Sequence, residues 1–284
     1  MKNIGIVVNN GKPRADEVVA RIEAAAAVVG LQVVFVRDAG LKTADTDAAL
    51  DGCDVVMALG GDGTMLRTVR LLDGRSIPVM GINIGSLGFL TTIAENEIES
   101  ALKMLAEGAF SIRPRCIAEA TVMREGRKIA GFRALNEILV SRGISPRVVT
   151  LDVAVNGDRV ASYVCDGIIV STPSGSTGHS LSAGGPILHP DAGVFVVSLI
   201  CPHTLSSRPL VVCDSSQIEV GSTAAGGVRL AVDGQVEHVL EDSDSIIITR
   251  SAKAAQFVIL PGFDYFSVLR RKLSWSVRQL PAAE

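Results

Sequence analysis

Residues 54–64 read DVVMALGGDGT, and this stretch decides the fold of the first part of the chain. Residues 54–59 are predicted to form a strand, because a short apolar run is typical of a strand buried on both faces of a parallel sheet. The run leads directly into Gly60-Gly61-Asp62-Gly63-Thr64, and a helix is predicted over 65–72. Open α/β sheets bind their ligands at such turns, beyond the carboxyl ends of the strands.

The sequence around this stretch alternates between strand and helix signals. Apolar runs predict strands over 4–8, 31–36 and 77–82. One helix is predicted to be capped by Asp16 and to stop at Gly30, and another covers 97–106 with Asn96 as its cap and Glu99 in a capping box. This rhythm predicts a doubly wound, Rossmann-like α/β domain over residues 1–110.

After residue 110 strands follow one another with few helices between them. The turn pairs Glu125-Gly126 and Asn156-Gly157 are typical of hairpins. Residues 111–260 are therefore predicted to form a β-rich, sandwich-like domain, and 261–284 a tail with an amphipathic helix over 265–275. The predicted strands cover 117–123, 148–155, 160–164, 167–171, 194–201, 246–249 and 256–260.

The composition excludes several classes of function. The net charge is -3, and the 284 residues include only one Trp and two Tyr, so neither a basic field nor an aromatic platform for nucleic acid is expected. No apolar stretch approaches the ~20 residues that span a bilayer, so no membrane partner is expected. The N-terminus resembles a first strand rather than a signal peptide. The five cysteines lack a C-x-x-C pair, and each is predicted to be a small buried hydrophobe. A cytoplasmic location fits best.

The glycines around Asp62 favour phosphate chemistry. Glycines let the backbone approach a phosphate, and the N-terminus of the following helix attracts negative charge. A carboxylate would repel phosphate there unless it held Mg²⁺ or accepted a proton, and both are tasks of phosphoryl transfer. The alternative is a tight strand–helix turn with Asp62 as N-cap. No Walker A pattern is present, which disfavours an ordinary P-loop kinase.

A second motif lies at residues 166–186, DGIIVSTPSGSTGHSLSAGGP. An apolar strand is followed by a Pro/Gly turn and a dense run of hydroxyl side chains. Hydroxyl groups supply donors and acceptors for ribose, amide and adenine groups without adding charge. A plain surface loop does not account for the whole run.

Taken together, these motifs resemble one family. The loop at Asp62 resembles that of the superfamily of phosphofructokinases, diacylglycerol-type lipid kinases and NAD kinases. The order of the further motifs resembles the NAD kinase family specifically, over essentially the whole chain. Those motifs are Asn136-Glu137, residues 171–177, 184–188 and 202–205, Arg208-Pro209 and Asp233-Gly234-Gln235.

The resemblance implies phosphorylation of the adenosine-ribose 2′-hydroxyl of NAD, with ATP or another phosphate donor, to give NADP and ADP. It implies that Asp62 accepts the ribose proton, that a divalent cation such as Mg²⁺ takes part, and that the protein is a homodimer or homotetramer. No residue is assigned as a metal ligand. The implied dinucleotide contacts are Gly63, Arg67, Asn136, Glu137, Arg147, Asp166, Thr177, Gly178, His179, Ser180, Leu181, Ser182 and Gln235.

Some alternatives stay open. Arg67 also fits a solvated helix face, and Arg147 a plain surface charge. The family usually has Thr-Ala-Tyr where this chain has Thr177-Gly178-His179, and histidine offers less ring area for stacking. The donor could be ATP or polyphosphate, and the acceptor NAD or NADH. A lipid or sugar-phosphate kinase and a non-catalytic dinucleotide sensor are the competing functions.

Overall fold

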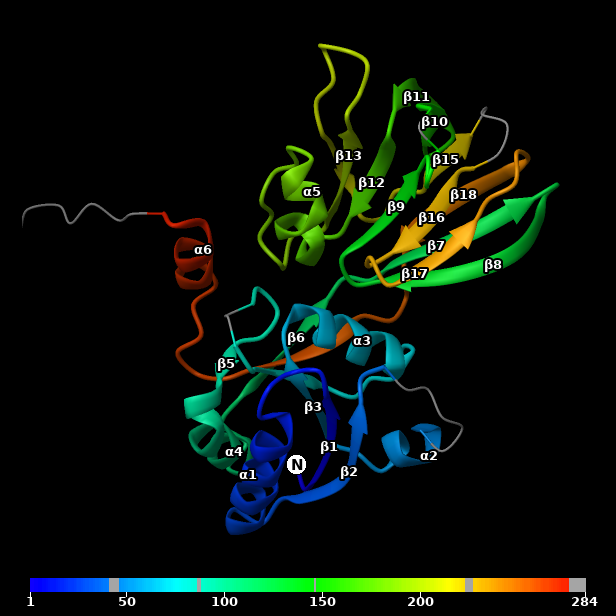
Figure 1. The fold of residues 1–284 in the computed structure, drawn as a ribbon. Coiled ribbons are helices and arrows are strands. Elements are labelled where there is room, and N and C mark those ends of the chain that lie inside the picture. The colour runs from blue at the N-terminus through cyan, green and yellow to red at the C-terminus, as the bar shows by residue number, and fades with distance from the viewer. Residues whose placement is uncertain (41–45, 86–87, 146, 223–226, 276–284) are drawn as a thin grey trace, which may run out of the picture. The chain divides into compact units, whose positions relative to one another are not determined.

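The computed structural model describes residues 1–40, 46–85, 88–145, 147–222 and 227–275. The chain divides into two compact units. The first consists of Met1–Leu72, Ile77–Arg113 and the segment that begins at Gln256, and the second of Asp73–Ser76 and Pro114–Ala255. The predicted fold class is confirmed, with an α/β unit and a β-rich unit (Figure 1).

The first unit is built on a seven-stranded sheet in the order β2-β1-β3-β4-β19-β6, with β5 also paired to β4. Strands β1, β3 and β4 are parallel neighbours and are buried along almost their entire length. The strands are β1 (Asn3–Val8), β2 (Gln32–Asp38), β3 (Val55–Gly60), β4 (Val79–Asn83), β5 (Ile93–Ala94), β6 (Ser111–Arg115) and β19 (Ala255–Ile259). The helices are α1 (Ala15–Val28), α2 (Thr46–Asp51), α3 (Asp62–Leu72), η1 (Glu95–Glu97), α4 (Ile98–Ala106) and α6 (Tyr265–Leu273).

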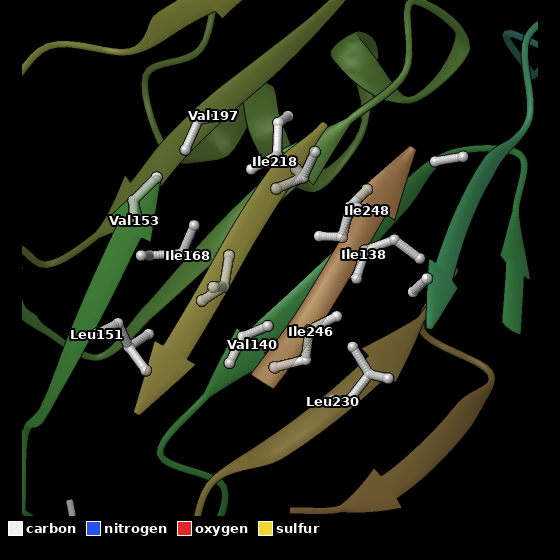
Figure 2. Packing of buried hydrophobic residues seen from close by; sticks show 14 of the residues in the cluster. Ile138, Val140, Leu151, Val153, Ile168, Val197, Ile218, Leu230, Ile246 and Ile248 are labelled. Carbon is white, nitrogen blue, oxygen red and sulfur yellow. The ribbon is translucent and has the colours of Figure 1, made fainter. Parts of the chain in front are cut away.

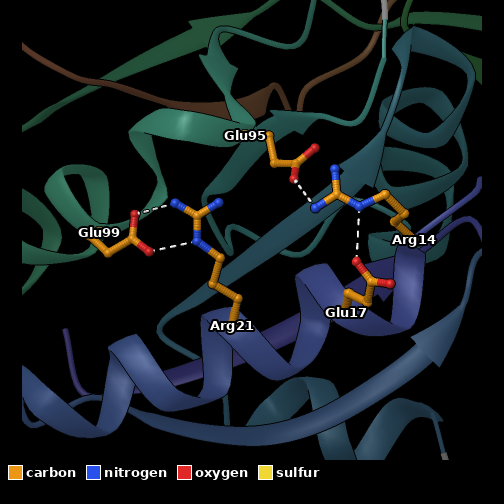
Figure 3. A network of polar contacts seen from close by, with 5 residues as sticks. All are labelled: Arg14, Glu17, Arg21, Glu95 and Glu99. Atoms are coloured by element: carbon orange, nitrogen blue, oxygen red, sulfur yellow. Dashed lines mark hydrogen bonds and ion pairs between the residues drawn. The ribbon is translucent and has the colours of Figure 1, made fainter.

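Helices α1 and α4 lie side by side (Figure 1), and each buries an apolar stripe in the core of this unit. Ion pairs join their exposed faces. Arg21 binds both carboxylate oxygens of Glu99 at 2.6 Å, and Arg14 bridges Glu17 and Glu95 (Figure 3). Exposed pairs of this kind add little stability, so the buried stripe holds the two helices.

Two predicted caps are wrong. Helix α1 begins at Ala15 after Arg14 in a left-handed conformation, so Asp16 lies inside the first turn. Helix α4 follows the short η1, where the Glu97 carboxylate accepts the Ala94 N–H at 2.8 Å, so Asn96 is not its cap. The predicted capping box does not form either, because the Glu99 carboxylate bonds to Arg21 on the neighbouring helix.

The second unit contains two six-stranded antiparallel sheets, in the orders β11-β10-β15-β18-β7-β8 and β14-β13-β12-β9-β16-β17. The first sheet is made of β7 (Ala118–Arg124), β8 (Arg127–Ala134), β10 (Val149–Val155), β11 (Asp158–Cys165), β15 (Ile218–Ser222) and β18 (Asp244–Arg250). The second is made of β9 (Glu137–Ser141), β12 (Gly167–Ser171), β13 (Val194–Ile200), β14 (Leu210–Cys213), β16 (Arg229–Val232) and β17 (Val236–Val239). The short helices η2 (Ser174–Thr177) and α5 (His179–Ser182) follow β12.

The two sheets share one core. Alternate residues along β10, β15 and β18 are buried, and they meet apolar residues of β9, β12 and β16 in a single cluster (Figure 2). Full burial of a Val, Leu or Ile side chain stabilises by about 1.5–3 kcal/mol, so this cluster provides the main support of the unit. Both predicted hairpins are confirmed: Glu125-Gly126 joins β7 to β8 and Asn156-Gly157 joins β10 to β11, all four residues at positive φ.

Two other expectations are corrected. The strand predicted over 256–260 was assigned to the β-rich domain, but as β19 it pairs in parallel with β4 of the first sheet. Cys201 and Cys213 are exposed rather than buried. No helix within the described ranges is both long enough and apolar enough to cross a bilayer.

Candidate active site

Asp62 lies at the carboxyl end of the buried strand β3, between β1 and β4. Helix α3 starts at Asp62 itself, three positions earlier than the sequence suggests. The N-cap alternative is not met, because Asp62 is already helical and its carboxylate bonds to another segment. Its Oδ2 accepts the N–H of Phe89 at 2.8 Å, and its Oδ1 accepts the N–H of Leu90 at 2.9 Å.

The loop after β4 fits closely around this carboxylate. A Cβ on Gly88 would lie 2.0 Å from Oδ1 of Asp62, so only glycine leaves room for it. Two backbone donors fix the direction of the side chain, yet each carboxylate oxygen has a further lone pair. Asp62 is therefore aimed and can still accept a proton.

Three buried polar residues surround this strand end: Thr64 on α3, Asn83 at the end of β4 and Thr91 after the Gly88 loop. The Oγ1 atoms of Thr64 and Thr91 and the Oδ1 atom of Asn83 have no hydrogen-bond partner among the described residues. Buried oxygens without partners are costly, so a water or ligand group is expected beside them. None of the three was predicted as a site residue, although Thr64 closes the quoted glycine loop; Asn83 and Thr91 belong to no motif that the sequence marks.

In the second unit, Glu137 is the first residue of β9 and Asn136 precedes it, and both are held through their backbone. The Asp233 carboxylate accepts the N–H groups of Leu135, Asn136 and Glu137 at 3.0, 2.7 and 3.1 Å. The Asn136 carbonyl in turn accepts the N–H of Thr172 at 2.9 Å. The loop before η2 thus pairs with the turn before β9.

The side chains of Asn136 and Glu137 are held differently from their backbone. The buried atoms Oδ1 of Asn136 and Oε2 of Glu137 have no partner within the described part of the chain. Burial, together with the negative charge of Asp233, raises the pKa of Glu137 from its ordinary value of 4.5 to about 7. A buried carboxyl with a displaced pKa and an open acceptor is a candidate for a binding site.

The hydroxyl-rich segment packs against this pair. A Cβ on Gly178 would lie 3.7 Å from Oε2 of Glu137 and 3.8 Å from Nδ2 of Asn136, so the segment passes close to both side chains. Gly178, His179 and Ser182 are exposed and available to a ligand. The segment therefore places exposed residues beside the side chains of Asn136 and Glu137.

Several hydroxyls in this segment support the loop instead of facing solvent. Ser176 donates to the Pro173 carbonyl at 2.8 Å and accepts the Leu188 N–H at 3.0 Å. Ser180 is fully buried, with its hydroxyl 3.0 Å from that of Ser198. The resemblance implied Ser180 as a dinucleotide contact; in the structure the Ser176 and Ser180 hydroxyls both hold the loop together.

The remaining predicted residues are more scattered. Arg67 and Gly63 are exposed on α3, and Arg147 is exposed beyond β9. Asp166 pairs with Arg142 at 2.8 Å, an ion pair that the sequence did not indicate. Gln235 lies in the hairpin that carries Asp233. Asp62, Gly63 and Arg67 belong to the first unit, and the other predicted residues to the second.

The described side chains do not suit a protein-held metal ion. No group of three or more His, Cys, Asp or Glu residues that could hold one occurs within the described ranges. A cavity of about 260 Å³ opens in the first unit beside α1 and β2, but Asp16, Glu23 and Asp38 line it against a single arginine, Arg37. Three carboxylates repel phosphate, so this cavity does not suit a nucleotide.

Comparison with known proteins identifies the family. A model of the ATP-NAD kinase N-terminal domain matches residues 4–110, and a model of the ATP-NAD kinase C-terminal domain matches residues 135–260. An NAD kinase of Geobacter metallireducens is 38% identical, over 98% of this chain and 100% of its own length. An NAD kinase of Symbiobacterium thermophilum is also 38% identical, over 96% of this chain and 99% of its own length.

Two solved structures are similar as well. The crystal structure of an NAD kinase from Archaeoglobus fulgidus in complex with ATP superimposes with a TM-score of 0.75 at 28% identity, covering 96% of this chain and 97% of that one. Yeast NADH kinase complexed with NADH gives a TM-score of 0.88 at 24% identity, covering 100% and 90%, and supports the fold. Both family models and the full-length relatives agree with the order of the motifs, and the chain belongs to the NAD kinase family.

Proposed function

We propose that this protein transfers the γ-phosphoryl group of ATP to the 2′-hydroxyl of the adenosine ribose of NAD, giving NADP and ADP. The observation that carries the proposal is Asp62, which is aimed by two backbone donors at the end of β3 in a chain of this family. A lipid or sugar-phosphate acceptor rested on the Asp62 loop alone, and no further observation favours it.

In this mechanism Asp62 accepts the proton of the ribose 2′-hydroxyl. A bond forms between the ribose oxygen and the γ-phosphorus while the bond from that phosphorus to its bridging oxygen breaks, and the electron pair leaves with ADP. Catalysis of phosphoryl transfer consists mostly of positioning and charge stabilisation. Support for a phosphate near Gly63 and Arg67 comes from the N-terminus of α3, which carries partial positive charge.

We assign recognition of NAD chiefly to Asn136 and Glu137, whose buried oxygens suit the donor hydroxyls of a ribose. The segment 177–182 would line the pocket beside them, and His179 would offer its ring to a base. Ser180 is buried and would support the pocket wall from inside. Arg147, Asp166 and Gln235 complete the proposed contacts by their correspondence with the family pattern. A dinucleotide sensor without activity would keep this pocket, but it would not need Asp62.

The proposal includes Mg²⁺, which would be bound mainly by the phosphates of ATP, because the described side chains do not form a cation site. Chelation with EDTA is expected to abolish turnover, and added Mg²⁺ to restore it. Turnover in EDTA at the wild-type rate would remove the cation from the proposal.

We also propose a homodimer or homotetramer in the cytoplasm. Leu205 is 101% exposed, and Leu210 and Val211 are exposed on the edge strand β14, which supports contact with a second copy. Sedimentation velocity at several concentrations measures the assembly, and a monomer throughout would contradict it. Cell fractionation measures the location.

The deciding experiment incubates the purified protein with a labelled phosphate donor and identifies which acceptor carries the label. ATP and polyphosphate are compared as donors, and NAD, NADH and diacylglycerol as acceptors. We expect phosphate on NAD with ATP. Phosphate on diacylglycerol but not on NAD would overturn the proposed function, and tight NADP binding with no turnover would support the sensor.

A further inference from the structure

Asp233 occupies the hairpin between β16 and β17, and its backbone has a left-handed conformation with φ of 51°. Gly234 follows with φ of 62°, and the Gln235 N–H donates to the Val232 carbonyl at 2.9 Å. Positive φ at both central residues is typical of a type I′ turn, for which Asp-Gly is a favoured pair. If Asp233 served only the turn, its side chain would be expected to bond to residues within the same hairpin.

The side chain instead reaches a distant part of the sequence. Its carboxylate accepts the N–H groups of Leu135, Asn136 and Glu137, which precede it by 98, 97 and 96 residues. The backbone N–H of Asp233 also donates to the Glu137 carbonyl at 3.1 Å. A carboxylate that accepts three backbone donors is a strong fixing point, because charge-assisted hydrogen bonds exceed neutral ones in strength.

The fixed backbone carries side chains that are not satisfied by the protein. Oδ1 of Asn136 and Oε2 of Glu137 are buried and have no partner in the described chain, although the N–H groups of both residues are bonded. A structural turn would satisfy its side chains along with its backbone. The arrangement holds the backbone and reserves the side chains for a ligand.

We propose that Asp233 is a positioning residue for NAD, whose carboxylate fixes residues 135–137 so that Asn136 and Glu137 meet the dinucleotide in the right geometry. The proposal rests on the proposed function for the identity of the ligand. Asp233 does not touch the reacting atoms, and it acts through its neighbours on β9.

The same arrangement has an electrostatic consequence. The Asp233 charge faces Glu137 and, together with burial, holds the pKa of Glu137 at about 7. Removing that charge lowers the pKa of Glu137 toward its ordinary value. Affinity for NAD should improve as Glu137 ionises, because a carboxylate accepts hydrogen bonds from ribose hydroxyls better than a carboxylic acid does.

The test compares Asp233→Asn and Asp233→Ala with wild type. Kinetics with NAD as the varied substrate should show a KM raised about tenfold or more in Asp233→Ala, the size expected when the displaced Asn136 or Glu137 loses one charge-assisted hydrogen bond to NAD, with kcat little changed. Asp233→Asn keeps one acceptor oxygen and should recover part of the affinity. In Asp233→Asn the midpoint of the pH dependence of KM should also move below the wild-type midpoint.

Matched controls are Glu125→Gln and Glu125→Ala. Glu125 has φ of 49° and precedes a glycine in the hairpin between β7 and β8, and it is exposed. The controls remove the same charge from the same kind of turn and should leave the KM for NAD unchanged. An equal rise in KM in the controls would show an effect of turn geometry or net charge and would overturn the proposal.

Hydrogen exchange of the ligand-free protein provides a readout that does not need activity. The amides of 135–137 should exchange slowly in wild type and faster in Asp233→Ala, while the β10 amides stay protected. Unchanged exchange at 135–137, or an unchanged KM for NAD, would overturn the positioning role. If wild type made no NADP, the proposed function would fail, and exchange together with calorimetric NAD binding would still decide the role of Asp233.

Discussion

Asp62 in the first unit and Glu137 in the second are both carboxylates at the end of a central strand, and the protein holds them in opposite ways. Each oxygen of Asp62 accepts a backbone N–H from the Gly88 loop. Oε2 of Glu137 is buried and has no partner among the described residues. The comparison suggests that a group acting on one proton must be aimed in advance, whereas a group that binds a ligand is left open for it.

The largest expected effect tests the aimed carboxylate. Asp62→Asn keeps the shape and one acceptor oxygen but loses the proton acceptor, so kcat should fall by about 10²–10⁴ while NAD still binds. Steady-state kinetics and calorimetry measure the two effects. The matched control is Asp54→Asn, since Asp54 also accepts two backbone N–H groups, from Lys2 and Asn3. If Asp62→Asn turned over like wild type, the catalytic assignment would be wrong.

The next effect tests how much the buried, unpartnered carboxyl of Glu137 lowers the free energy of unfolding. The pKa of Glu137 rises from 4.5 to about 7 on folding, so the folded state binds more protons than the unfolded state between these values. Stability therefore falls as pH rises through this window, by up to about 3 kcal/mol above pH 7. Glu137→Gln removes this titration and should unfold at a higher urea concentration than wild type at pH 8.

The gain in Glu137→Gln should shrink as pH approaches 4.5, and the variant should bind NAD more weakly. Urea titrations at several pH values measure the first effect. Glu125→Gln, at an exposed position, serves as the control and should track wild type. Parallel stability curves for Glu137→Gln and wild type would show that the open carboxyl costs nothing.

A smaller effect tests how closely the second unit is packed around Asn136 and Glu137. A Cβ on Gly175 would lie 2.1 Å from the Asn136 carbonyl oxygen, so Gly175→Ala must displace the backbone beside Glu137. We expect a loss of about 1–3 kcal/mol in unfolding free energy and a higher KM for NAD. Gly221→Ala in β15 is the control, because nothing lies within 4 Å of its added Cβ. Equal stability of both variants would contradict the close fit.

The smallest expected effect concerns the departure from the family pattern. His179 is exposed on α5, and Tyr would offer a larger ring for stacking on a base. His179→Tyr should tighten NAD binding by roughly 2- to 10-fold, which corresponds to about 0.5–1.5 kcal/mol for an aromatic contact. His203→Tyr, in an exposed loop, is the control. Weaker binding by His179→Tyr would show that the histidine makes a contact that the ring cannot replace.

The sequence predicted what depends on neighbouring residues. The buried strand before Asp62, the glycine turn and the helix after it follow from apolar runs and local backbone preferences, and the structure has all three. The hairpin pairs Glu125-Gly126 and Asn156-Gly157 were also recognisable, because positive φ restricts which residues can occupy the turn. The motifs further indicated the family that the comparisons show.

Other features could not be predicted in the same way. The helix caps at Asp16 and Asn96 were wrong because several neighbouring residues can start a helix: α1 begins at Ala15, and Glu97 accepts the Ala94 N–H at the short helix before α4. The thirteen implied dinucleotide contacts came from resemblance, and the structure brings Asn136, Glu137 and Gly178 together among them. Ser180 showed no sign in the sequence of being buried against Ser198.

By itself, then, the sequence determined the alternation of elements, the position of Asp62 at a strand end and the turns that join the hairpins, since periodicity and φ preferences act over a few residues. Tertiary structure alone decided that β19 returns to the first sheet beside β4 and that Asp233 meets residues 135–137. It also decided that Asp62 is fixed by Phe89 and Leu90. The physical reason is that these contacts join segments far apart in the chain, whose pairing is set by the burial of whole sheets and not by any local pattern.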